Sequence, residues 1–146
     1  MRSFPFPQDI SRQIVLGFDF GTRRIGVAIG QGITQTARPL KPILVREAGI
    51  PWLEVQRLIK EWGPTSLLVG IPLNMDGSEQ AITALAREFA EELHHRFNLP
   101  IYEVDERLTT KEAKAQIFEQ YGYKGLVGSS VDSYAAKLII ETWFSQ

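Results

Sequence analysis

Residues 14–20 have the sequence IVLGFDF, an apolar run that ends in Asp19 and Phe20 and is followed by Gly21 and Thr22. Such a run predicts a buried strand that leads into a turn. Residues 25–30 (IGVAIG) favour a second strand, and residues 40–45 a third. The short joints between the three predict an antiparallel meander at the start of the fold.

After the meander, strands and helices are expected to alternate. Residues 66–71 (SLLVGI) are apolar on both faces, which is typical of a buried parallel strand. A further strand is expected over residues 101–106. Four helices are expected: residues 51–62, Ser78 to Phe97, Thr109 to Tyr121 with a capping box formed by Thr109 and Glu112, and about Ser130 to Phe144. This order predicts an α/β fold with a mixed five-stranded sheet, three antiparallel strands leading, flanked by helices on both faces.

Length and composition predict one globular domain. The chain has 146 residues, of which 44% are hydrophobic and 23% charged, and we expect residues 13–146 to form the domain and residues 1–12 a flexible extension. The absence of cysteine excludes disulfides, thiolate zinc sites and cysteine nucleophiles. No apolar run is long enough for a signal peptide or a membrane span, so we expect a cytoplasmic protein that does not contact membranes.

Acidic residues fall where an α/β sheet gathers its functional groups, at the carboxyl ends of strands. Asp19, Asp105 and Glu106 lie at such ends, and Asp132 lies near the start of the last helix. Carboxylates from separate segments suit Mg²⁺ or Mn²⁺, and two such ions about 3.5–4 Å apart can hold a phosphodiester for in-line attack.

Each acid also has a structural interpretation. Asp19 could shape the turn before Gly21, and Asp132 could cap the helix. Because successive strand residues point to opposite faces, only one of Asp105 and Glu106 can point into a shared site, and alternation alone leaves that choice open.

Residues 70–78 (GIPLNMDGS) form an expected loop beside the site, where Asn74 and free amides could hold a substrate backbone; an ordinary connector is the alternative. Basic residues near the acids could contact phosphates, or could be scattered surface charge: Arg23, Arg24, Arg107, Lys111 and Lys124. The net charge of −1 does not favour binding of nucleic acid by bulk electrostatics.

Four motifs together resemble one known family. They are FDFGTRRIGVAIG (18–30), VGIPLNMDGSEQ (69–80), VDERLTTKEA (104–113) and VDSYAA (131–136), and they follow one another in the order found in the YqgF/RuvX family. The resemblance implies an RNase H-like fold related to RuvC. It also implies a bacterial cytoplasmic nuclease that matures the 5′ end of pre-16S rRNA, an older description being a Holliday junction resolvase.

The resemblance further implies roles for individual residues. Asp19 matches the aspartate of the first motif and Asp132 that of the last, while the DER motif supplies the second acid, with Glu106 favoured over Asp105. These acids would hold Mg²⁺ or Mn²⁺, and Arg23 and Arg107 would hold the scissile region.

For the substrate, the resemblance favours precursor rRNA, and with it ribosomal particles, over a four-way DNA junction. The alternatives are a Holliday junction resolvase and a non-catalytic nucleic-acid-binding or assembly factor. The sequence does not determine the oligomeric state.

Overall fold

One mixed sheet of five strands organises the molecule. The computed structural model describes residues 5–108 and 129–146. The strands lie in the order β3-β2-β1-β4-β5 and are β1 (Ile14–Asp19), β2 (Arg24–Gln31), β3 (Thr36–Leu44), β4 (Ser66–Ile71) and β5 (Ile101–Asp105). β1 pairs with β2 and β2 with β3 in antiparallel fashion, whereas β4 runs parallel to both β1 and β5. The predicted mixed sheet with a leading antiparallel meander is confirmed.

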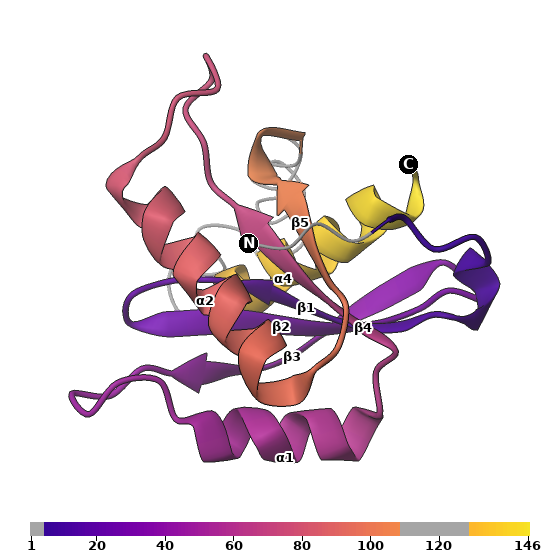
Figure 1. Cartoon of the computed structure of the whole chain (residues 1–146), viewed down its shortest axis with the longest axis horizontal. Helices are drawn as coiled ribbons and strands as arrows, with labels where there is room; N and C mark the ends of the chain where they lie inside the picture. The colour runs from indigo at the N-terminus through magenta and orange to yellow at the C-terminus, as the bar shows by residue number, and fades with distance from the viewer. Residues whose placement is uncertain (1–4, 109–128) are drawn as a thin grey trace.

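Helices cover both faces of this sheet (Figure 1). Helices α1 (Trp52–Trp62) and α2 (Ala81–Phe97) pack on one face over a core that includes Phe18 and Val69. Helix α4 (Ser129–Phe144) packs on the other face against Val15 and Leu68. Alternate residues of β1 and β4 therefore point to different helices, as strand geometry requires.

Glycines bring α4 unusually close to the sheet. A side-chain carbon added at Gly26 would lie 1.9 Å from the carbonyl oxygen of Asp132, and one added at Gly17 would lie 2.6 Å from Ile140 Cγ1. The start of α4 is also tied to β2, because the backbone N–H of Val27 donates to Ser133 Oγ over 3.3 Å. The first turn of α4 is thus fixed over the middle of the meander.

Three predicted boundaries were wrong for physical reasons. β3 begins at Thr36 rather than Leu40, since it pairs with β2 from Gln31 onward and prolines are tolerated in this edge strand. α2 begins at Ala81 rather than Ser78, because Ser78 bonds to the loop before the helix. β5 ends at Asp105, and Glu106 begins a short 3-10 helix, η2 (Glu106–Leu108).

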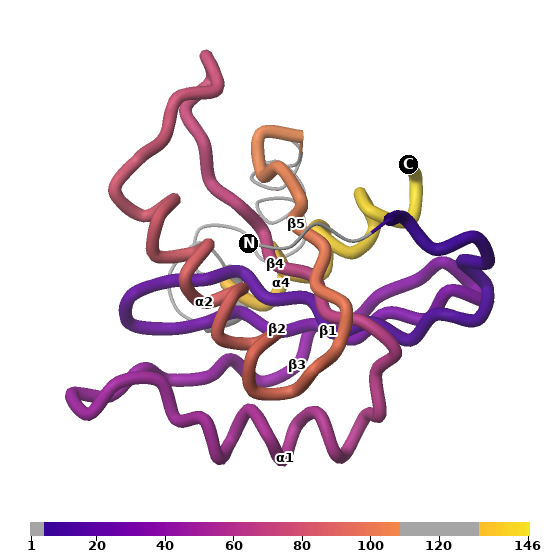
Figure 2. Tube along the Cα trace, viewed as in Figure 1, coloured from indigo at the N-terminus to yellow at the C-terminus, as the bar shows by residue number. Residues whose placement is uncertain are grey.

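Two further features complete the chain trace (Figure 2). The chain leaves β4 in an extended loop, residues 72–80, before it enters α2. Near the amino terminus, Phe6 packs on Trp143 with ring centroids 5.0 Å apart, and a short 3-10 helix, η1 (Ile10–Arg12), follows.

The flexible extension over residues 1–12 stays a prediction, and the helix predicted to start at Thr109 lies outside the described residues. Among residues 5–108 and 129–146, no helix combines the length and apolarity needed to cross a membrane.

Candidate active site

The carboxyl groups of Asp19 and Glu106 meet across β4 on the α4 face of the sheet. Asp19 is the last residue of β1, and its half-buried side chain shares a hydrogen bond with Glu106. Glu106 lies against Gly70 of β4, where an added side-chain carbon would stand 2.5 Å from Glu106 Oε1. Gly70 therefore leaves the space through which the two acids reach each other.

This arrangement changes the protonation of Asp19. Burial raises the pKa of Asp19 well above its usual range, and the hydrogen bond with Glu106 and the negative charges of Glu106 and Asp132 raise it further. Two carboxyl groups at hydrogen-bond distance repel each other strongly when both are ionised, so Asp19 tends to keep its proton. A cation could take the place of that proton.

Asp132 approaches the same region from the first turn of α4. Burial raises the pKa of Asp132, while the Arg24 guanidinium opposes this rise from 4.0 Å. Asp19 pairs with Gly26 in the β1–β2 register, and the backbone of Asp132 rests on Gly26, so strand register and helix packing together bring the third acid near the first.

The residues fit a divalent cation in donor chemistry, since carboxylate oxygens from three segments are what Mg²⁺ and Mn²⁺ prefer. Within residues 5–108 and 129–146, however, no three acidic or histidine side chains are already arranged around one point that could hold a metal ion. Asp19 and Glu106 face each other, whereas Asp132 is turned towards Arg24.

Asp105 does not join these acids. Its carboxylate accepts hydrogen bonds from Arg107 Nε (3.0 and 3.1 Å) and Nη2 (2.6 Å), and from the Arg107 backbone N–H (2.9 Å). The side-chain hydrogen bond from Arg107 lowers the pKa of Asp105 and the same bond raises the pKa of Arg107. Of the two neighbouring acids, Glu106 contacts Asp19, whereas Asp105 is paired with Arg107.

The remaining predicted site residues are spread around this centre. Arg23 is exposed in the β1–β2 turn. Asn74 is exposed in the loop after β4, where its side chain donates to Ser78 Oγ over 2.9 Å. Arg107 contacts the same loop, because its Nη1 donates to the Met75 carbonyl over 3.4 Å. Lys111 lies outside the described residues.

Sequence reasoning missed the residues that support the acids. Ser133 ties α4 to β2, and Gly26 and Gly70 give Asp132 and Glu106 room to approach. A glycine inside a strand pattern is the signal for close approach of another segment, so the two glycines could have been found. A buried serine one residue after an acid carries no comparable signal.

Comparison with known proteins gives a family match over almost the whole chain. Residues 13–146 match the model of the family RuvX, described as Holliday junction resolvase. A protein from Proteus mirabilis is 51% identical over 138 residues, which cover 94% of this chain and 99% of that protein. One from Actinobacillus pleuropneumoniae is 56% identical over 131 residues, covering 89% and 95%. Both carry the name "Putative pre-16S rRNA nuclease".

Two solved structures with a similar fold are Holliday junction resolvases. T. thermophilus RuvC in complex with a Holliday junction substrate matches with a TM-score of 0.53 at 16% identity, over 86% of this chain and 90% of that one. The yeast mitochondrial Holliday junction resolvase Ydc2 matches with a TM-score of 0.54 at 13% identity, over 93% and 78%. At these identities the likeness establishes the fold, which is the RNase H-like fold expected from the sequence.

Proposed function

The chain belongs to the RuvX family, and from that premise we propose that it is a metal-dependent endonuclease that matures the 5′ end of pre-16S rRNA. The activity class follows from the family, whose relatives at about half identity are named as nucleases. The substrate is proposed from the same names. With that substrate we also propose a cytoplasmic location and contact with ribosomal particles.

One observation supports the proposal above the others. Asp19 and Glu106 come from distant parts of the chain and hold their carboxyl groups together at the carboxyl end of the parallel strands, with Asp132 within electrostatic reach. A fold has no structural need for like charges at this distance, and the repulsion between them opposes folding. Such a cluster is characteristic of a site that binds a cation.

In the proposed mechanism, Asp19, Glu106 and Asp132 hold Mg²⁺ or Mn²⁺. When bound, the ion supplies activation of water for attack on phosphorus and stabilisation of charge on the phosphate. To hold the ion, Asp19 would have to be ionised, and Asp132 would contribute the third carboxylate from the first turn of α4. Arg24, which lies 4.0 Å from Asp132, and the exposed Arg23 next to it would contact phosphates beside the scissile bond.

The proposal is tested by Mn²⁺-dependent cleavage with wild-type protein and Asp19→Asn. A short precursor spanning the 5′ end of 16S rRNA is incubated with each protein, with metal and with EDTA. We expect the wild type to cleave the RNA when metal is present but not in EDTA, and the variant to cleave it in neither condition. Equal cleavage by both proteins would show that Asp19 does not hold the catalytic ion.

The second candidate activity is resolution of four-way DNA junctions, which the description of the matching family favours. A four-way junction offered beside the precursor RNA separates the two. Paired cuts in the junction with no cleavage of RNA would replace the proposed substrate while leaving the metal-dependent mechanism intact. Binding of RNA without cleavage of either substrate would favour the non-catalytic alternative.

A further inference from the structure

The segment 72–80, here called the arm, is an ordered hairpin that projects from the end of β4 (Figure 1). Leu73 and Glu79 form an antiparallel bridge at its base. The backbone N–H of Asn74 donates to the Ser78 carbonyl over 2.9 Å, and that of Gly77 donates to the Asn74 carbonyl over 2.9 Å. These bonds fix the shape of the arm, but they lie within it and do not fix its direction.

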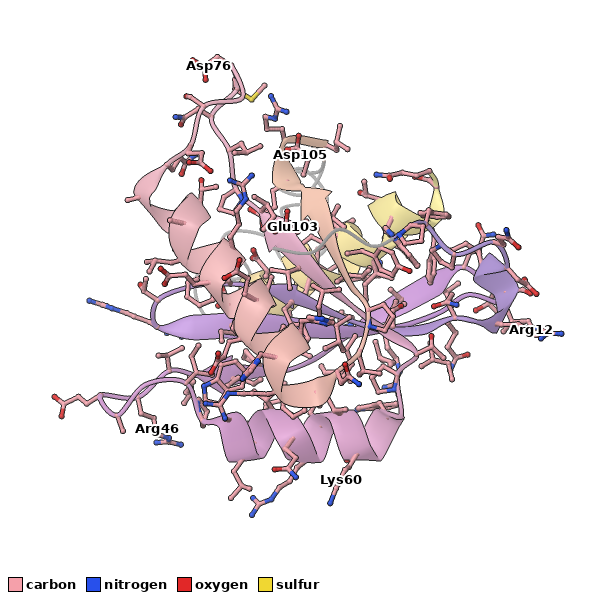
Figure 3. All side chains as sticks on the ribbon, viewed as in Figure 1. Arg12, Arg46, Lys60, Asp76, Glu103 and Asp105 are labelled. Carbon is pink, nitrogen blue, oxygen red and sulfur yellow. The ribbon has the colours of Figure 1, made fainter. Side chains whose placement is uncertain are left out.

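The base of the arm is held to α2, because Thr83 Oγ1 donates to the Pro72 carbonyl and Arg87 forms an ion pair with Glu79. The tip of the arm is held by a contact with the chain after β5. Arg107 Nη1 donates to the Met75 carbonyl near the tip over 3.4 Å. Gly77 makes room for this contact, since an added side-chain carbon would stand 3.3 Å from the same nitrogen. Gly77 also has a φ of +89°, a conformation in which glycine is favoured. Figure 3 shows Asp76 at the tip and Asp105 below it, at the end of β5.

Arg107 is itself held in one orientation by Asp105. The carboxylate engages Nε and Nη2 of the guanidinium together, in the two-pronged geometry that fixes the plane of an arginine, and it also accepts the Arg107 backbone N–H. Nη1 is the guanidinium nitrogen that remains for the arm. Asp105 therefore acts on the arm through Arg107.

We propose that Asp105 is a positioning residue, which through Arg107 holds the arm beside the Asp19–Glu106 pair so that the arm can grip nucleic acid. The arm presents Met75, whose side chain is 82% exposed, and Leu108 of η2 is 59% exposed next to Arg107. Apolar side chains on a fixed support suit contact with unpaired bases, and the Asn74 amide suits the backbone. The positive charge of Arg107 offsets the negative charge of Asp76 at the tip. This inference rests on the proposed nuclease function.

Asp105→Asn tests the proposal, with Asp9→Asn as a matched control. Asp9 also accepts a backbone N–H from two residues ahead, Ser11, and pairs with a following arginine, Arg12. Arg12 lies on the opposite side of the molecule in Figure 3. The two substitutions remove the same charge from similar local structures, and only one of them is connected to the arm.

Three quantities are measured for each protein. They are the affinity for Mn²⁺, the KM and kcat for cleavage of a short single-stranded RNA, and the mobility of a nitroxide label at position 75. The chain has no cysteine, so Met75→Cys gives a single labelling position. Because the arm and the carboxylates are separate, we expect Asp105→Asn to raise KM about five- to tenfold, keep kcat within about twofold and leave Mn²⁺ affinity unchanged. The nitroxide becomes more mobile, and Asp9→Asn changes none of these.

The double variant Asp105→Asn/Arg107→Gln checks that the two residues act as a unit. Its KM should equal that of Arg107→Gln alone, since Asp105 has no effect once Arg107 is gone. A fall in Mn²⁺ affinity in Asp105→Asn, of the size seen in Glu106→Gln, would make Asp105 a metal ligand and overturn the proposal. So would a nitroxide that stays equally immobile, or effects matched by Asp9→Asn.

A different result would overturn the proposed nuclease function instead. If the wild-type protein cleaves no RNA or DNA, that function fails. The nitroxide mobility and the affinity for the same RNA in EDTA still decide whether Asp105 holds the arm for binding.

Discussion

Two neighbouring regions of the molecule use the same kinds of side chain in opposite ways. The carboxylate centre consists of Asp19, Glu106 and Asp132. Asp19 and Glu106 share a hydrogen bond and Asp132 lies nearby, and burial and these two acids raise the pKa of Asp19. Beside the arm, Asp105 is paired with Arg107, and hydrogen bonds from that arginine lower the pKa of Asp105. The first region brings like charges together, which opposes folding, whereas in the second each charge has an opposite partner. The adjacent residues Asp105 and Glu106 therefore have different partners, since β5 ends at Asp105 and Glu106 begins η2.

The largest expected effect is on kcat, when one acid of the carboxylate centre is substituted. Glu106→Gln should lower kcat about 100- to 1,000-fold, because it removes a charged ligand of the proposed ion. Glu103→Gln, on the exposed side of the same strand, is the control and should cleave like the wild type. Single-turnover cleavage of the precursor RNA measures both. Similar activity in the two variants would mean that the carboxylate centre is not the active site.

The next largest effect concerns how the centre is built. Gly26→Ala should lower the free energy of unfolding by about 3 kcal/mol, since the new methyl group would collide with backbone at the start of α4. Gly63→Ala is the comparison: Gly63 has a φ of +55° with nothing near, so the loss should be about 1 kcal/mol. Urea denaturation measures both values. Equal losses would show that α4 can shift away from the sheet freely.

A smaller effect of opposite sign is expected from Asp19→Asn. Because the pKa of Asp19 is raised in the folded protein, its ionisation opposes folding, and the folded state gains stability as pH falls through that raised pKa towards the ordinary value of 3.8. In EDTA at neutral pH the variant should therefore be more stable by about 1–2 kcal/mol.

Thermal unfolding from neutral to acid pH measures this difference. It should vanish below pH 3.8, where Asp19 is protonated in both folded and unfolded chains. A variant that is less stable at every pH would contradict the repulsion at the carboxylate centre.

The smallest expected effect is on KM, and it separates the backbone strain of an alanine at positive φ from the contact of that alanine with Arg107. Gly77 (φ +89°) and Gly49 (φ +109°) are both in the region that favours glycine, so alanine at either position should lower stability by about 1 kcal/mol. At Gly77 the methyl group also meets Arg107, whereas at Gly49 it meets nothing. Gly77→Ala should therefore raise KM about twofold and Gly49→Ala should not. Steady-state cleavage kinetics measure the difference, and equal KM values would show that Arg107 tolerates the crowding.

The fold could be predicted from the sequence because its signals are local. The run that ends in Asp19 and the segment SLLVGI are each continuously apolar, and the structure buries both as strands. Helix boundaries were less predictable where hydrogen bonds hold a residue in the preceding loop. Ser78, for example, donates to Asp76 and stays outside α2.

The candidate site was predictable in its residues more than in its pairings. Strand alternation left the choice between Asp105 and Glu106 open. The strand ends at Asp105 and Glu106 begins a 3-10 helix, so alternation does not apply across the pair. The arginine partner of Asp105 could not be inferred, since an arginine two residues ahead can equally point to solvent. Nor could the contact of Arg107 with the Met75 carbonyl, which comes from a distant part of the chain.

The order of the chain along the fold has a consequence for synthesis. Asp19 and Glu106 lie on the sheet, but Asp132 arrives with α4, which packs against strands made much earlier. Domains form as their segments emerge from the ribosome, with the amino terminus first. A growing chain of this protein therefore lacks its third acid until the last helix has emerged and docked.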